Sequence, residues 1–242
     1  MERTVEGLPT PIGRIIKESV VANAVPALVL WLITVGLAAA YRFLPRVASV
    51  LEPVVHWQER NGFASAFLSQ FMFCGLVPCV FLLTVKSIAT KRPVVKSIIQ
   101  SVWCGLMGMA CWWFYGVQTW LFGTGRDIAT LMAKTAFDQF VWTAFVVSPL
   151  SAAFFVWLGC DFSVTAALRT FRRSFVRRIV MPNLVANWCV WIPVAAAIYT
   201  FPRSLQIHVL SLVASFWVLL SLQIGSRSAA ASCDVWHDAG GE

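Results

Sequence analysis

The sequence predicts an all-α membrane protein, a polytopic bundle of about six transmembrane helices. Of its 242 residues, 59% are hydrophobic and only 12% are charged, whereas a soluble globular domain carries about 25% charged residues. The few charged residues gather between long apolar runs, each close to the roughly 20 residues that a helix needs to cross a bilayer. The formal net charge of +8 suits contact with anionic membrane lipids. Because the basic residues flank apolar runs, we do not expect nucleic-acid binding.

The chain divides into a polar N-terminal arm (1–18), a transmembrane helical domain (19–224) and a C-terminal tail (225–242) that we expect to be disordered. The first apolar run is too long for the apolar region of a signal peptide, so we expect it to remain as a membrane span. The predicted spans are 19–41, 63–85, 97–122, 134–158, 184–201 and 205–224.

Two of the connections are distinctive. Residues 42–62 are predicted to be a polar connection broken by Pro45 and Pro53, and residues 123–133 a short loop.

The distribution of Lys and Arg predicts the topology. These residues number thirteen on the arm, the connections 86–96 and 159–183 and the tail, against six on the three opposite connections. The excess of positive charge predicts that both termini face the cytoplasm or its equivalent.

The connection after the fourth span contains the most basic segment, ALRTFRRSFVRR. On a helix, its apolar and basic residues separate onto two sides, which is typical of a helix lying on an anionic membrane surface. A basic loop that only sets topology is the alternative. The residues predicted to contact lipid headgroups are Arg169, Arg172, Arg173 and Arg177.

Asp138 is the strongest indication of function, because it falls inside the fourth apolar run. An ionised carboxylate near the centre of a span costs about 3 kcal/mol, so it normally faces the bundle interior, a water-filled cavity or a partner charge. The structural alternative is a pair with Lys134, one helical turn earlier. The residues predicted to line a pore or polar interior are Lys134, Asp138, Gln139, Gln118, Asn187, Trp188 and Trp191.

Small residues on the third span predict close helix packing. Cys104, Gly108 and Cys111 fall on one face, where the backbone of a neighbouring helix can approach. None of the seven Cys forms a C-x-x-C pair and there are only three His, so we expect no metal site. The absence of a recognisable catalytic motif leads us to expect no enzymatic activity, no catalytic residue and no cofactor.

Three features in the second two-thirds of the chain occur in a characteristic order. They are Lys134-x-x-x-Asp138-Gln139 at the opening of a span, Asn187-Trp188-x-Val190-Trp191, and Pro202 followed by Trp217. From about residue 63 to 224 the chain therefore resembles the Mpv-seventeen / 22-kDa peroxisomal membrane protein family, as a divergent member. The departures include Ile192, where the family has Pro, and Ala195 and Ile198-Tyr199, where it has Gln and Asn-Phe.

The resemblance implies an integral protein of a bacterial inner membrane or of an organellar membrane, mitochondrial inner or peroxisomal. Relatives are proposed to be weakly selective channels for small solutes, so the first hypothesis is a channel whose partners are membrane lipids and small solutes. The alternative is a non-conducting membrane scaffold that binds lipid or a partner protein. Assembly into a homo-oligomer is open under both hypotheses.

Overall fold

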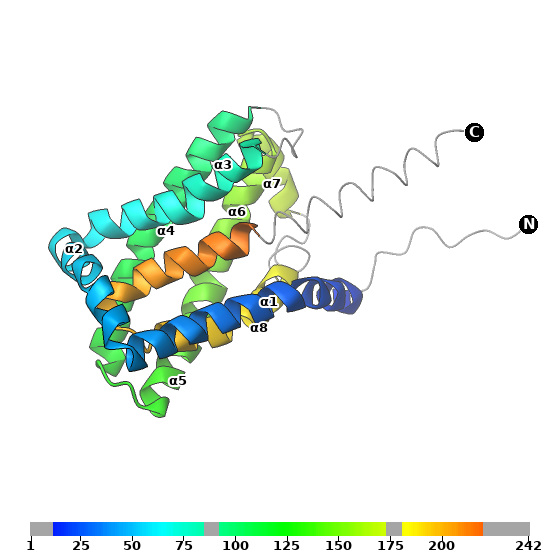
Figure 1. The fold of residues 1–242 in the computed structure, drawn as a ribbon. Helices are drawn as coiled ribbons and strands as arrows, with labels where there is room; N and C mark the ends of the chain where they lie inside the picture. The colour runs from blue at the N-terminus through cyan, green and yellow to red at the C-terminus, as the bar shows by residue number, and fades with distance from the viewer. Residues whose placement is uncertain (1–11, 85–91, 173–180, 220–242) are drawn as a thin grey trace, which may run out of the picture.

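The computed structural model describes residues 12–84, 92–172 and 181–219 of the chain. Over these ranges the structure consists of helices and short connections, without a β-strand (Figure 1). The predicted all-α class is therefore confirmed. The tail (225–242) and residues 1–11 of the predicted arm lie outside the described residues.

The N-terminal helix α1, Ile12–Phe43, lies along α8, Met181–Ile198 (Figure 1). Leu30, Val190 and Val194 are buried between them, and the Trp31 indole N–H donates to the Val190 carbonyl at 2.9 Å. Since α1 begins at Ile12, residues 12–18 of the predicted polar arm belong to this helix.

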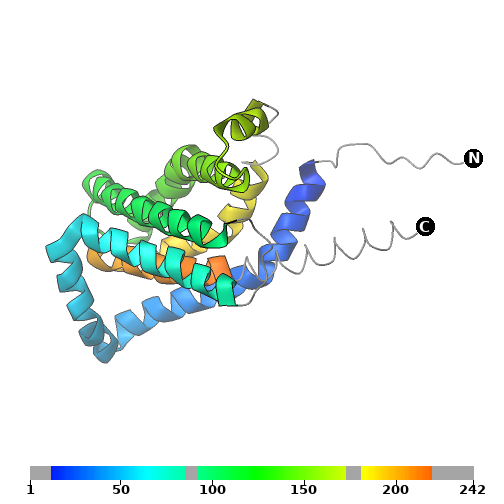
Figure 2. The ribbon, with the colours of Figure 1, turned by 90° about the horizontal axis from the view of Figure 1, so that it is seen from above.

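Residues 42–62 are not a polar connection, so that prediction is wrong. Helix α2, Pro45–Gln70, begins directly after Leu44 and includes Pro53. Pro45 is tolerated because the first turn of a helix leaves its N–H groups unpaired in any case. The helix bends at Gly62 (φ 48°, ψ −111°), a conformation that glycine adopts readily. Figure 2 shows the corner between α1 and α2 and the bend within α2.

The predicted second span begins after this bend and continues through the π-helical segment η1, Phe71–Leu76, into α3, Val77–Thr84. It packs against α4, Pro93–Phe122, with almost no space between the two backbones. A Cβ atom on Gly108 would lie 2.6 Å from the Ala66 carbonyl oxygen. The close approach predicted for this face of the third span is confirmed.

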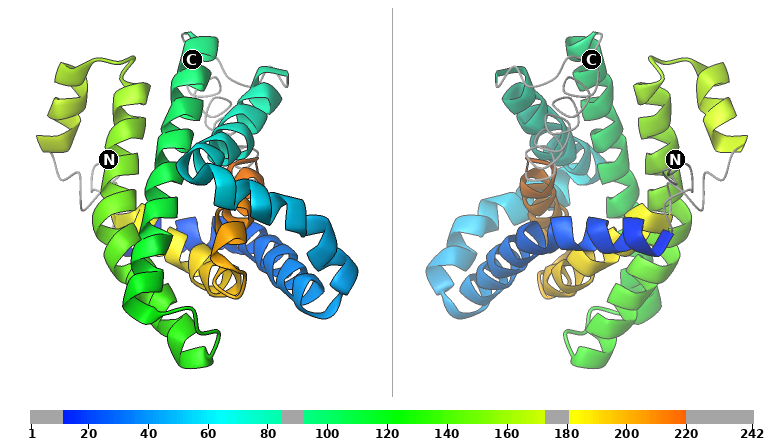
Figure 3. Two further views of the ribbon diagram at one scale, coloured as in Figure 1. Left: turned by 90° about the vertical axis from the view of Figure 1, so that its left-hand side faces the viewer. Right: turned by 90° about the vertical axis from the view of Figure 1, so that its right-hand side faces the viewer.

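The next long helix runs from α5, Ile128–Phe137, through the π-helical segment η2, Asp138–Val147, to α6, Ser148–Gly159. It begins earlier than the predicted 134, because Asp127 caps it by accepting a hydrogen bond from the Thr130 backbone N–H at 3.0 Å. Figure 3 shows this helix beside α4, with α1 and α8 crossing the pair. Stacking of Trp103 on Phe154, with ring centroids 4.4 Å apart, joins the two helices.

After α6 the chain forms α7, Val164–Arg172, which is the first part of the predicted basic helix. The final helix of the described residues, Arg203–Leu219, is called the C-terminal helix here and is orange in Figure 1. Three helical stretches are long and apolar enough to cross a membrane: Pro45–Phe81, Pro93–Phe122 and Ile128–Gly159. Three apolar helices are shorter: Ala27–Phe43, Asn187–Ile198 and Arg203–Leu219.

The surface and the interior have the polarity expected of a protein surrounded by lipid. Large apolar side chains are exposed along α1, α4 and η2, among them Leu32, Trp120 and Phe145. Polar side chains are buried between the helices. Such groups avoid lipid because an unsatisfied polar group there costs several kcal/mol. Buried polar residues in the long helices and beside them include Gln70, Ser101, Gln118, Lys134, Asp138, Gln139, Thr143 and Gln206.

Candidate functional site

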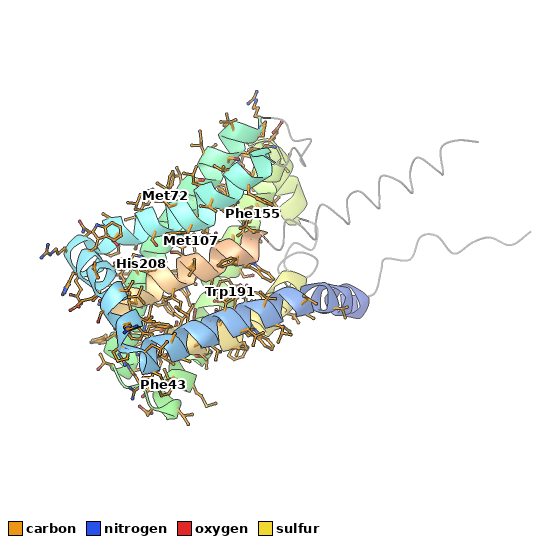
Figure 4. The ribbon with its side chains drawn as sticks, viewed as in Figure 1. Phe43, Met72, Met107, Phe155, Trp191 and His208 are labelled. Atoms are coloured by element: carbon orange, nitrogen blue, oxygen red, sulfur yellow. The ribbon has the colours of Figure 1, made fainter. Side chains whose placement is uncertain are left out.

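A cavity of about 280 Å³ lies between the helices. Its walls come from α2, η1, α4, η2, α6, α8 and the C-terminal helix, so segments from both halves of the chain meet around it. Three of its lining residues, Met107, Phe155 and Trp191, are labelled in Figure 4. The polar side chains that line it are Gln70, Gln100, Asp138, Gln139, Thr143, Ser151 and Asn187.

Asp138 is the only acidic residue that lines this cavity within the described residues. It lies ten residues after Ile128, which places it about 15 Å along the helix and well inside the membrane-spanning length. Its side chain is 9% exposed. The helix begins before the predicted start at Lys134, so Asp138 is deeper in the span than the sequence suggested.

The carboxylate of Asp138 is held mainly by Tyr199, which follows directly after α8. The Tyr199 hydroxyl donates to Asp138 Oδ2 at 2.8 Å. Two longer contacts come from its own helix, with Thr143 Oγ1 at 3.4 Å from Oδ1 and Gln139 Nε2 at 3.4 Å from Oδ2. Thr143 is five residues beyond Asp138, a spacing that the wider π-helical turn brings onto one side.

Tyr199 is itself fixed by aromatic packing. Its side chain is buried, and the ring of Tyr115 on α4 meets it edge to face with centroids 5.8 Å apart. The hydroxyl therefore has little freedom to turn away from Asp138. The end of α8 thus supplies a rigid donor to a carboxylate of the long α5–α6 helix.

Lys134 does not form the ion pair that was the structural alternative for Asp138. Within the described residues Lys134 has no carboxylate within 4.0 Å. Its side chain instead lines a second, separate cavity of about 190 Å³ at the same end of the bundle as the α4–α5 connection. Asp138 and Lys134 thus line two different cavities. Tyr199 lines the second cavity and donates a hydrogen bond to Asp138, which lines the first.

The remaining residues predicted to line a pore divide into two groups. Asn187 and Trp191 line the main cavity together with Asp138 and Gln139. Gln118 and Trp188 do not line this cavity, but their side chains bond to the backbone of the helix that carries Asp138. The Gln118 side chain donates to the Lys134 carbonyl at 3.1 Å, and the Trp188 indole donates to the Gln139 carbonyl at 2.9 Å.

The predicted lipid contacts fall at the limit of the described structure. Arg169 and Arg172 belong to α7, but their side chains are outside the described part of the structure, as are Arg173 and Arg177 entirely. Their contact with lipid stays a prediction. In the described ranges, no group of three or more His, Cys, Asp or Glu side chains is arranged to hold a metal ion.

Tyr199, Tyr115 and Thr143 were not predicted as site residues. Thr143 and Tyr115 carry no sequence pattern that separates them from ordinary span residues. Tyr199 had one available indication, because it stands where the resemblance expects an Asn-Phe pair. A departure that removes the amide of Asn but introduces the hydroxyl of Tyr can preserve a polar group in that region.

Three helical stretches of membrane-spanning length, apolar outward surfaces and polar side chains buried between the helices define the class: this chain is a helical membrane protein. Comparisons with models of protein families, with curated proteins and with solved structures found no match. The resemblance to the Mpv-seventeen / 22-kDa peroxisomal membrane protein family therefore rests on the residues of this sequence alone.

Proposed function

We propose that the protein provides a weakly selective pathway for small polar solutes across its membrane. The observation that carries the proposal is the buried carboxylate of Asp138, which lines a cavity at membrane depth. An intramembrane carboxylate is costly and is normally retained at a substrate or ion pathway. A cavity of about 280 Å³ has room for several water molecules, each of which occupies about 30 Å³ in the liquid.

The arrangement around Asp138 supports a narrow point in such a pathway. Asp138 lines the main cavity and Tyr199 lines the second cavity, and the hydrogen bond between them lies where the two spaces approach each other. Under this proposal, a solute that moves from one space to the other would pass this contact. The negative charge of Asp138 would favour cations at this point.

The proposal includes a topology of about six spans, with the three shorter apolar helices completing the bundle and both termini on the cytoplasmic side. It also includes membership of the Mpv-seventeen / 22-kDa peroxisomal membrane protein family, and with it a bacterial inner membrane or an organellar membrane. Labelling of a single cysteine introduced near either terminus, from one side of sealed vesicles, tests the topology. Opposite accessibility of the two termini would contradict it.

Solute flux in proteoliposomes tests the function directly. The native protein, Asp138→Asn and the exposed control Glu52→Gln would be compared over neutral, cationic and anionic solutes. Both substitutions exchange a carboxylate for an amide, but only Asp138 lines the cavity. We expect flux through the native protein, altered preference between cations and anions for Asp138→Asn, and native behaviour for Glu52→Gln. Absence of flux for every solute, from protein that is folded, would refute the proposal.

The second candidate is a non-conducting scaffold that binds lipid or a partner through the basic segment beginning in α7. The close contact of Gly108 with the α2 backbone favours it, because such packing makes a rigid bundle. Under this alternative, Asp138→Asn changes stability and leaves vesicle permeability at the level of protein-free vesicles. A stable Asp138→Asn protein with altered flux excludes it.

A further inference from the structure

The second cavity is distinct from the cavity that contains Asp138. It lies between the end of α4, the α4–α5 connection, α5 and the start of the C-terminal helix. Three of its lining residues are cations, namely Arg126, Lys134 and Arg203. None of its lining residues is acidic. It is therefore a small space with a strong local excess of positive charge.

Lys134 is the deepest of the three cations. Its side chain is only 5% exposed, and no carboxylate of the described residues lies within 4.0 Å of it. The two acidic residues nearest to it along the chain are engaged elsewhere: Asp138 accepts from the Tyr199 hydroxyl, and Asp127 accepts from the hydroxyl and the backbone N–H of Thr130. A buried ammonium is costly unless it is paired. The site therefore lacks the negative charge that would balance it.

Arg203 is held in place at the same cavity. Its guanidinium carbon lies 4.2 Å from the centroid of the Trp112 ring, which is a cation–π contact. A Cβ atom on Gly116 would lie 2.8 Å from one guanidinium nitrogen. The absence of a side chain at Gly116 thus leaves the space that the guanidinium needs, and the stacking on Trp112 fixes its position.

Two neutral polar residues around the cavity are already engaged. Thr119 donates to the Tyr115 carbonyl at 2.8 Å, and Gln206 donates to the Phe201 carbonyl at 3.0 Å. The side-chain donors left for a ligand are therefore the cations and the Thr124 hydroxyl. A guanidinium presents paired N–H groups that match the oxygens of a phosphate, and an ammonium adds a point charge. Three cations without an acid suit an anion of more than one negative charge.

We propose that the second cavity is a binding site for a phosphate group, carried either by a free small solute or by a lipid headgroup. The buried Lys134 and the stacked Arg203 hold the phosphate oxygens, and the exposed Arg126 attracts the anion at the entrance. Binding here does not depend on conduction through the cavity beside Asp138, so it holds whether or not solutes cross the membrane.

The first arm of the test is titration of the purified full-length protein in detergent with inorganic phosphate, against chloride at equal ionic strength. Binding would be followed by calorimetry and by the change in Tm. The variants are Lys134→Gln and Arg203→Gln, with the exposed Arg46→Gln as the matched control. We expect each cavity variant to weaken binding by about tenfold or more, because a hydrogen bond to a charged group is worth that factor. Arg46→Gln is expected to bind as the native protein does.

The second arm distinguishes a lipid source from a free solute. The same proteins would be incubated with vesicles of phosphatidylcholine alone and with vesicles that contain phosphatidic acid, which exposes a phosphate monoester. Retention of phosphatidic acid that depends on Lys134, with weak binding of inorganic phosphate, indicates a headgroup. The opposite pattern indicates a free solute.

Removal of a buried unpaired cation is expected to leave the ligand-free Tm unchanged or higher, which separates lost binding from lost folding. The exposed Arg126→Gln provides a variant that does not disturb the interior, and it is expected to weaken binding as well. Equal binding of phosphate and of phosphatidic acid by the native protein and all three cavity variants would overturn the proposal. Absence of any binding by the native protein would overturn it equally.

Discussion

The hydrogen bond from Tyr199 to Asp138 is the contact whose removal tests the site most directly. Tyr199→Phe deletes one hydroxyl and keeps the ring that packs against Tyr115. The substitution leaves the Asp138 carboxylate buried, with its shortest partner removed. The variant therefore separates the polar contact from the aromatic packing.

The structure sets the size of the expected effect. The deleted bond is 2.8 Å long and reaches a buried carboxylate, and hydrogen bonds to charged groups contribute about 1.5–3 kcal/mol. The contacts that remain, from Thr143 and Gln139, are both 3.4 Å long and exceed the usual distance for a strong bond. They compensate little, so we expect Tyr199→Phe to lower the free energy of unfolding by about 2 kcal/mol.

Unfolding in mixed micelles of a mild detergent and dodecyl sulfate measures this change. Tyr41→Phe is the control, since Tyr41 packs its ring on Phe201 while its hydroxyl has no hydrogen bond to a described residue; its effect is expected to stay below about 0.5 kcal/mol. Combination of Tyr199→Phe with Asp138→Asn gives the coupling energy of the pair, expected at about 1 kcal/mol or more. A coupling near zero, or equal effects of Tyr199→Phe and Tyr41→Phe, would refute the reasoning.

Three further predictions follow from local geometry. Gly108→Ala forces a Cβ atom to within 2.6 Å of the Ala66 carbonyl oxygen and is expected to destabilise the protein by about 1–3 kcal/mol. The control Gly36→Ala, whose Cβ atom meets nothing within 4 Å, is expected to be neutral. Equal unfolding free energies of the two variants would contradict the packing. Gly116→Ala is expected to displace the Arg203 guanidinium and weaken phosphate binding without loss of the ligand-free Tm; calorimetry measures this, and native affinity would argue against a fixed guanidinium. The pKa of the Asp127 carboxyl is lowered by hydrogen bonds from the first turn of α5, of which the bond from the Thr130 side chain is the largest cause. Its carboxylate therefore stabilises the start of α5 above the unfolded-state pKa, and this contribution is lost as the pH falls through the lower folded-state pKa. Asp127→Asn is expected to keep the cap and remove the pH dependence of amide exchange in that turn, and an unchanged pH profile would exclude Asp127 as its cause.

The long helices were largely predictable, because apolar residues recur over lengths that only a membrane helix requires. The predicted spans 63–85, 97–122 and 134–158 all fall within or close to the three helical stretches of spanning length. The structure extends each stretch toward its N-terminus, to Pro45, Pro93 and Ile128. Hydropathy identifies the apolar part of a helix, whereas hydrogen bonding continues through the polar residues before it.

The error at residues 42–62 has a local cause. Pro45 and Pro53 were interpreted as breakers, but proline is compatible with the first turn of a helix and can be accommodated farther along one. The true break is at Gly62, where a positive φ turns the chain and the Gln58 side chain donates to the Gly62 carbonyl at 2.8 Å. Glycine alone does not indicate such a bend in a sequence, because it also occurs within straight helices.

The partner of Asp138 is a second case. Sequence spacing favoured Lys134, since residues four apart lie on the same side of a helix. The structure instead places Tyr199, 61 residues later, against the carboxylate, and turns Lys134 toward the second cavity. Local spacing shows which residues can meet, but burial between helices decides which partner is nearer.

The sequence by itself therefore determined the class of the protein, the approximate positions of its long helices and the residue, Asp138, that is buried at membrane depth. These follow from the cost of exposing polar groups to lipid, which acts on each segment separately. Only the tertiary structure decided that Tyr199 holds Asp138 and that Lys134, Arg126 and Arg203 surround one space without an acid. Such contacts depend on how α4, α5, α8 and the C-terminal helix cross, and that crossing is set by side-chain packing between segments far apart in the chain.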